Sequence, residues 1–85
     1  MRPVVLVGHR HECPKHGTGT VVSGTAGVTV NGREVACIGH AISCGATITS
    51  GSSTVTLKGK GVARIGDSSS HGGTLVEGEG AWLID

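Results

Sequence analysis

Hydrophobic and polar positions alternate along short stretches of this chain, and glycine interrupts the stretches. In residues 46–49 and 54–57, Ala, Ile, Val and Leu alternate with threonines, which is the two-residue period of a strand with one buried and one solvated face. The longest stretch without glycine, residues 9–16, contains a proline and is too short for an ordinary globular helix. The pattern therefore predicts an all-β fold.

Short apolar or β-branched segments, with Gly, Ser, Asn or Asp between them, are the candidate strands. They are residues 4–7, 20–23, 28–30, 35–38, 46–49, 54–57, 62–65, 74–76 and 81–84. The dipeptides Asn31-Gly32 and Lys58-Gly59 are expected to make tight reversals between strands, because the Asn-Gly pair favours such turns.

The sequence contains three copies of one repeat unit. Aligning the glycines at 8, 39 and 66 brings Cys13, Cys44 and His71 into register, each five residues after its glycine. The first unit carries extra residues between Cys13 and Gly17. The units run over residues 5–32, 36–59 and 63–85. Because no linker separates them, we expect them to wrap around a common axis or to stack along one.

The 85 residues are expected to form a single domain, residues 1–85, with a small core. With one Trp and no Phe or Tyr, the core must be built from Val, Ile, Leu and Ala, and a cross-link is expected to support it. The net charge is +1, and the basic residues are scattered. Nucleic-acid binding is disfavoured, because it needs clustered positive charge or aromatic platforms for stacking.

The chain shows no basic and apolar leader and no apolar run near the roughly 18 residues of a transmembrane helix. We therefore expect a protein made in the cytoplasm without a conventional signal peptide. Because the sequence stops at Asp85, we also expect no fused toxin domain.

A zinc site is the chemistry that the repeat predicts. Zinc prefers thiolate and imidazole ligands in a tetrahedron, and the register supplies one such ligand in each unit: Cys13, Cys44 and His71. The extra residues of the first unit carry His16, in "CPKHG", which we take as the fourth ligand of one structural zinc. His11 is the reserve ligand, because in an extended segment it falls on the same side as Cys13.

Other readings apply to several of these residues. The cysteines could be small buried hydrophobic residues and the histidines surface or turn residues, but the register favours zinc. Cys37 lies inside the predicted strand 35–38, so packing is expected of it rather than ligation. His9 and His40 directly follow the register glycine, where the third unit has Asp67, and a turn or hydrogen-bonding role is expected there.

Several longer motifs occur in phase: "VARIGD" at 62–67 followed by "SSSHGG", "VACIGH" at 35–40 followed by "AISCGA", and "CPKHG" at 13–17. With these motifs the chain resembles PAAR-repeat proteins, which form the tip of the type VI secretion spike. The resemblance covers nearly the whole chain. It implies a small pseudo-threefold cone of short β-strands, with a zinc near the apex and a base seated on a trimeric valine-glycine repeat spike protein.

The chain departs from the family pattern in two ways. A literal Pro-Ala-Ala-Arg is missing, and residues 34–37 and 61–64 read "EVAC" and "GVAR" instead. The family's zinc is typically held by three histidines and one cysteine, whereas the register selects Cys13, His16, Cys44 and His71. If the family pattern holds, His11 takes the place of Cys13 or, less readily, of Cys44.

The resemblance implies a mechanical and non-enzymatic role. One tip would cap each spike trimer, carry an effector or adaptor, and touch the target membrane transiently, so the protein would be cytoplasmic before firing and then secreted or injected into a target cell. A zinc-dependent hydrolase is the alternative, with Glu12 and Asp67 as the acids nearest the predicted ligands, but so small a domain leaves little room for a cleft. A zinc-stabilised binding module is a further alternative.

Overall fold

The computed structural model describes residues 1–14 and 17–85, and the regular structure in this part of the chain is entirely β. The strands are β1 (Arg2–Val4), β2 (Arg10–Cys13), β3 (Gly17–Thr20), β4 (Thr25–Val30), β5 (Arg33–Val35), β6 (Thr56–Leu57), β7 (Lys60–Gly61), β8 (Thr74–Leu75) and β9 (Glu79–Ile84). They form four small antiparallel sheets with the orders β1-β9, β3-β2-β8, β4-β5 and β6-β7. The all-β prediction is confirmed.

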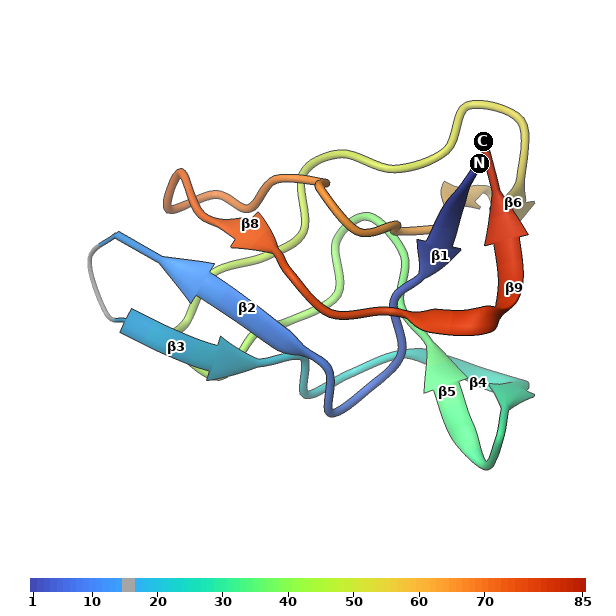
Figure 1. Cartoon of the computed structure of the whole chain (residues 1–85), viewed down its shortest axis with the longest axis horizontal. Coiled ribbons are helices and arrows are strands. Elements are labelled where there is room, and N and C mark those ends of the chain that lie inside the picture. Colours follow the sequence, from blue (N-terminus) through green and yellow to red (C-terminus); the bar gives the residue numbers. More distant parts are fainter. Residues whose placement is uncertain (15–16) are drawn as a thin grey trace.

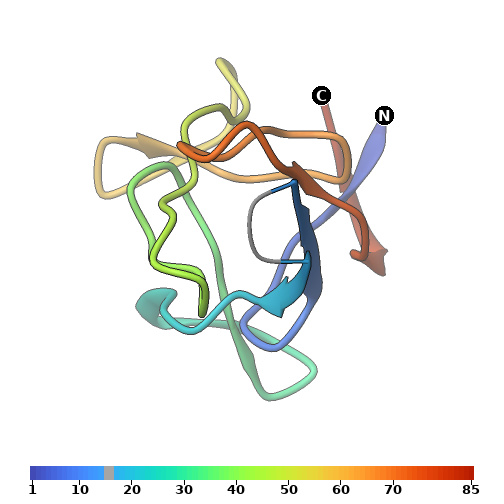
Figure 2. The same ribbon diagram turned by 90° about the vertical axis from the view of Figure 1, so that its left-hand side faces the viewer.

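The sheets gather at two ends of the molecule (Figure 1). Strands β2, β3 and β8 lie at one end, which we call the narrow end. The hairpins β4-β5 and β6-β7 and the pair β1-β9 lie toward the opposite end, which we call the broad end, and both chain termini are there. Seen from the narrow end, the chain makes three lobes around a common centre (Figure 2). None of the described residues forms a helix of the length and hydropathy needed to cross a membrane.

A closed ring of three backbone hydrogen bonds marks the centre of this arrangement. The Val5 N–H donates to the Ala63 carbonyl (3.0 Å), the Ala63 N–H to the Ala36 carbonyl (2.9 Å), and the Ala36 N–H to the Val5 carbonyl (2.9 Å). All three residues are completely buried. Each unit therefore donates to one neighbour and accepts from the other, so the units wrap around a pseudo-threefold axis and do not stack along it.

The turn that follows the ring is built alike in the three units. A side chain accepts a hydrogen bond from the backbone N–H three residues earlier, and the pairs are Leu6 with His9 Nδ1 (3.0 Å), Cys37 with His40 Nδ1 (2.8 Å) and Arg64 with Asp67 Oδ2 (2.7 Å). The preceding glycines have φ near +92°, which disfavours any other residue type there. The hydrogen-bonding role expected for His9 and His40 is confirmed.

Two apolar clusters fill the interior, and Val, Ile, Leu and Ala dominate both, as the composition requires. One lies toward the narrow end and comprises Val5, Val21, Ala36, Ile42, Ala46, Ile48, Ala63 and Leu75. The other lies toward the broad end and comprises Val4, Leu6, Val35, Cys37, Val62 and Ile84. Cys37 is completely buried there, with Sγ 3.4 Å from Thr25 Oγ1, so the packing role expected for it is confirmed.

The sequence correctly predicts which side chains of the alternating segments are buried and where the tight reversals lie, but it predicts the strand positions only in part. Ala46 and Ile48 are buried while Thr47 and Thr49 are exposed, as their alternation predicts. Both residues of each predicted reversal have positive φ, between 52° and 81°, at Asn31-Gly32 and Lys58-Gly59. Those turns are confirmed.

The predicted strands over residues 4–7, 20–23, 35–38, 46–49 and 62–65 are largely wrong as continuous elements. Near the axis successive residues bond to different units, which leaves isolated bridges such as Leu6 to Val35 and Cys37 to Val62 in place of ladders. Strands β2 and β3 were not predicted. Strand β2 pairs with β3 and also with β8 of the third unit, so long-range contacts stabilise a segment whose own sequence is not typical of a strand.

Candidate metal centre

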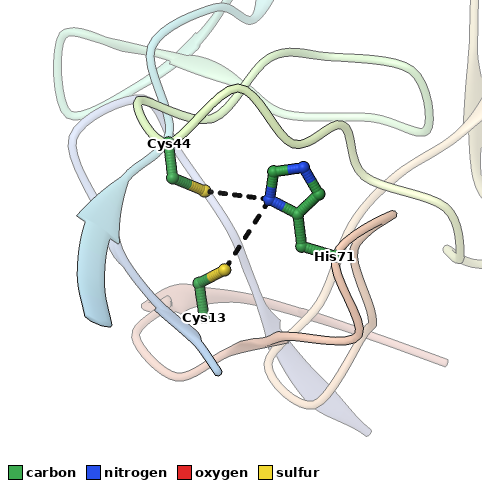
Figure 3. Close-up of side chains that lie close together, drawn as sticks. All are labelled: Cys13, Cys44 and His71. Carbon is green, nitrogen blue, oxygen red and sulfur yellow. Dashed lines mark hydrogen bonds between the residues drawn. The ribbon is translucent and has the colours of Figure 1, made fainter. Parts of the chain in front are cut away.

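Three sulfur and nitrogen donors meet at the narrow end (Figure 3). Cys13 ends β2, Cys44 lies in the turn after Ile42, and His71 lies in the loop before β8. In each unit the residue two positions before the donor makes an equivalent antiparallel β-bridge. The bridged pairs are His11 with Leu75, Ile42 with Val21 and Ser69 with Ile48. One repeated backbone pairing therefore aims all three side chains at the axis.

The distances suit a tetrahedral metal ion. Cys13 Sγ lies 3.7 Å and Cys44 Sγ 3.9 Å from His71 Nδ1, and the three donor atoms all lie within 4.8 Å of one another. A zinc ion with bonds of about 2.3 Å to sulfur and about 2.0 Å to nitrogen holds its sulfur and nitrogen ligands about 3.5 Å apart. Both sulfur–nitrogen distances are thus within a few tenths of an ångström of zinc geometry.

The chemistry of these donors also fits. Cys13 is buried, Cys44 and His71 are partly exposed, and the cysteines are free thiols. Thiolate and imidazole are the ligands that zinc takes in structural sites, and binding would release the thiol protons. The ring nitrogen of His71 that faces both sulfurs is Nδ1 (Figure 3).

The structure brings together three of the four predicted ligands. His16, predicted as the fourth, lies outside the described residues, so the identity of the fourth ligand stays a prediction. A sequence register that places one donor per unit on the axis was enough to find Cys13, Cys44 and His71.

His11, the reserve ligand, lies beneath the group and does not belong to the three clustered donors. It is completely buried on the same face of β2 as Cys13, as expected from its spacing. Its Nε2 lies 2.7 Å from Ser69 Oγ, which also accepts the Gly73 N–H (3.1 Å). Burial lowers the pKa of His11. A neutral His11 therefore steadies the loop that carries His71.

Ser69 is a supporting residue that the sequence reasoning missed. It occupies the unit position of His11 and Ile42, two residues before the donor, so the register indicates its position but not its contact with His11. Its hydroxyl joins β2 to the loop before β8 by the contact with His11. The geometry of Cys13 and His71 therefore depends on this pair.

Fold and site together define a small all-β protein with pseudo-threefold internal repetition and a Cys/His group able to hold a metal ion. The family model described as the PAAR motif matches residues 1–50 and again 47–77. The two matches cover most of the chain, and the protein belongs to the PAAR-motif family. A comparison with functionally curated proteins gives no match.

Proposed function

We propose that this protein is the zinc-bound tip of a type VI secretion spike, with one copy capping each trimer of the valine-glycine repeat spike protein. The observation that carries the proposal is the ring of hydrogen bonds among Val5, Ala36 and Ala63 in a chain of the PAAR-motif family. A single chain can match three equivalent partner surfaces only if its own structure repeats three times, and the ring supports the proposal because it is such a repeat.

The broad end offers a surface suited to such a partner. Val28, Val55 and Trp82 occupy the same position in the three units, and each packs, half-buried, against the apolar cluster of the broad end. Among residues 1–14 and 17–85, strands β4, β6 and β9 each pair with a single neighbour, so each keeps an open edge in this part of the chain. A threefold partner would cover these apolar side chains and edges together.

Zinc suits the opposite end. We propose Cys13, His16, Cys44 and His71 as its ligands. A bound ion would cross-link segments of all three units, where the apolar core ends in partly exposed loops. Closed zinc sites in small domains contribute on the order of 10 kcal/mol to folding, which is enough to hold a narrow tip rigid.

The remaining aspects of the role follow from this one. The protein would be made in the cytoplasm, leave with the spike when the sheath contracts, and be secreted or injected into a neighbouring cell after brief contact with its membrane. It would act by shape and not as an enzyme, and an effector or adaptor could travel with it. Nucleic acid has no part in the proposal.

Stoichiometry tests the capping role. Mixing the protein with its cognate spike and weighing the complex by native mass spectrometry should give one tip to three spike chains. Val55→Glu should prevent capping while zinc stays bound, whereas Val22→Glu, at a side chain that is 53% exposed outside the broad-end cluster, should leave capping intact. A complex of three tips with three spike chains would refute the proposal.

A second experiment tests the ligand set. A zinc-edge absorption spectrum should count two sulfurs, from Cys13 and Cys44, and one sulfur would reject that pair. His16→Ala should weaken zinc binding by about 10-fold or more, and His11→Ala by less, since altered ligand surroundings typically cost this much. The reverse order of the two histidine variants would make His11 the ligand.

A further inference from the structure

A hollow of about 200 Å³ lies between the first and second units, beside the β6-β7 hairpin. Residues 24–26 form one wall, and the other lining residues are His40, Leu57, Lys58 and Lys60. We call it the lysine hollow. No carboxylate is among its lining residues.

The charged groups and the imidazole of the lysine hollow are hydrogen-bond donors. Lys58 Nζ donates to the Ala26 carbonyl at 3.3 Å, which holds its ammonium across the hollow. His40 Nδ1 accepts the Cys37 N–H, so the ring proton is on Nε2. Burial and then the charge of Lys60 lower the pKa of His40, whereas Glu34 raises it, so the ring is neutral and the Lys60 ammonium acts on it. The lining therefore presents two ammonium groups and an imidazole N–H.

The corresponding place between the second and third units contains a carboxylate of the chain itself. Asp67 takes the position of His40, and Arg2 takes that of Lys60. Asp67 Oδ1 lies 3.7 Å from Arg2 Nη2 and 2.9 Å from Arg64 Nη2. The basic residue at this place is thus neutralised within the chain.

The place between the third and first units also has an acid of the chain, at a different position. Glu79 takes the position of Thr25, and Asn31 takes that of Lys58. A hydrogen bond from Asn31 is the largest cause that lowers the pKa of Glu79, and the charge of Arg33, at the position of Lys60, adds to it. Of the three equivalent places, only the lysine hollow has neither acid.

We propose that the lysine hollow binds one carboxylate group, supplied by an Asp or Glu side chain of a partner protein. Each of its two equivalents has an acid of the chain at the position of His40 or of Thr25, whereas the lysine hollow has an acid at neither position. Glu34 acts on His40 from outside, because it is not among the lining residues. Neither the metal nor the proposed spike enters this proposal, because every contact behind it lies between residues of this one chain.

Acetate is the simplest probe. The zinc-loaded, ¹⁵N-labelled full chain is titrated with sodium acetate, with sodium chloride exchanged to keep the ionic strength constant. We expect saturable shifts of the Thr25, Ala26 and Lys60 amides, with half-saturation on the order of 10 mM for one carboxylate held by partly exposed cations. Lys60→Gln should weaken binding about two- to fivefold. Equal shifts with chloride alone, or tighter saturation by phosphate, would overturn the carboxylate assignment.

Two matched variants test the location. His40→Asp places a carboxylate where Asp67 has one, so it should accept the Cys37 N–H, neutralise Lys60 and abolish the acetate shifts. His9→Asp makes the same change in the turn of the first unit, where Glu77 and Glu79 act on the histidine, and should leave acetate binding unchanged. Acetate binding that survives in His40→Asp, or in Lys60→Gln at full strength, would refute the proposal.

The source of the carboxylate is tested with a blocked Gly-Glu-Gly tripeptide and its Gly-Gln-Gly counterpart. The glutamate peptide should shift the same amides as acetate, and the glutamine peptide should not. Binding of acetate without the glutamate peptide would assign the lysine hollow to a free small acid and overturn the protein partner.

Discussion

Cys13 and Cys37 provide a matched test of the metal centre. Both side chains are almost completely buried, at 4% and 0% exposure, and a change to serine replaces one buried sulfur by oxygen at either position. Only Cys13 belongs to the three clustered donors. We therefore expect the stabilisation by zinc to be largely lost in Cys13→Ser and kept in Cys37→Ser.

The size of the effect follows from the geometry. Because both sulfur–nitrogen distances already lie within a few tenths of an ångström of tetrahedral spacing, we expect zinc to bind the folded state with little rearrangement. Free zinc at about 1,000 times its dissociation constant stabilises the folded protein by about 4 kcal/mol. In a domain of this size each kcal/mol corresponds to roughly 4–8 °C of melting temperature, so zinc should raise the midpoint by about 15–30 °C.

The assay compares melting curves, followed by circular dichroism, after chelation and after return of zinc. Replacing buried sulfur by oxygen has its own packing cost, but that cost is present in both states of a variant and cancels in the difference between them. An equal loss of the zinc-dependent rise in Cys37→Ser and Cys13→Ser, or its full survival in Cys13→Ser, would refute the assigned site.

Three further predictions concern the framework. Burial lowers the pKa of both His9 and His40 below the usual 6.5, so the stability that depends on their neutral rings is complete above pH 6.5 and declines as the pH falls toward the lowered values. Replacing both histidines with asparagine should therefore flatten the pH dependence of the free energy of unfolding, measured in urea between pH 7.5 and 5 with zinc saturating. An unchanged slope would contradict this. Asp67→Ala should cost about 2–4 kcal/mol in urea unfolding, because it leaves the mostly buried Arg64 guanidinium unpaired, and a cost no greater than that of His40→Ala would contradict the ion-pair argument. Gly73→Ala should destabilise by about 1–3 kcal/mol and weaken zinc binding measurably in a competition titration, because the added carbon would clash with the Glu12 carbonyl oxygen and with His11 Nε2; unchanged affinity would separate this packing from the metal site.

The sequence was sufficient for the features that local chemistry decides. Alternation placed Ala46 and Ile48 inside, and the two-residue reversals at Asn31 and Lys58 have the positive φ values that their turns require. The alignment of Cys13, Cys44 and His71 was predictable for another reason. Repetition converts equal positions in sequence into equal positions around an axis, so three donors in register must approach one another.

Features that depend on contacts between units could not be predicted. Strand β2 contains His11 and Glu12, which do not favour a strand, and it is extended because β3 and β8 pair with it on both sides. The lysine hollow likewise exists only where the first and second units meet. Neither the support of His11 by Ser69 nor the missing acid beside Lys60 is visible until residues about one or two units apart are brought together.

The pairing of β1 with β9 makes the chain termini structurally interchangeable with its hairpin turns. Arg2 faces Ile84 as Arg33 faces Val30 and as Lys60 faces Leu57, so Asp85 and Met1 take the places that the other units give to the turn residues. A circular permutant with the old ends joined through a two-residue turn and new ends opened at Asn31-Gly32 should therefore reach the same fold. The fold requires the three units to close around the axis, and it does not require them to follow one another in this order along the chain.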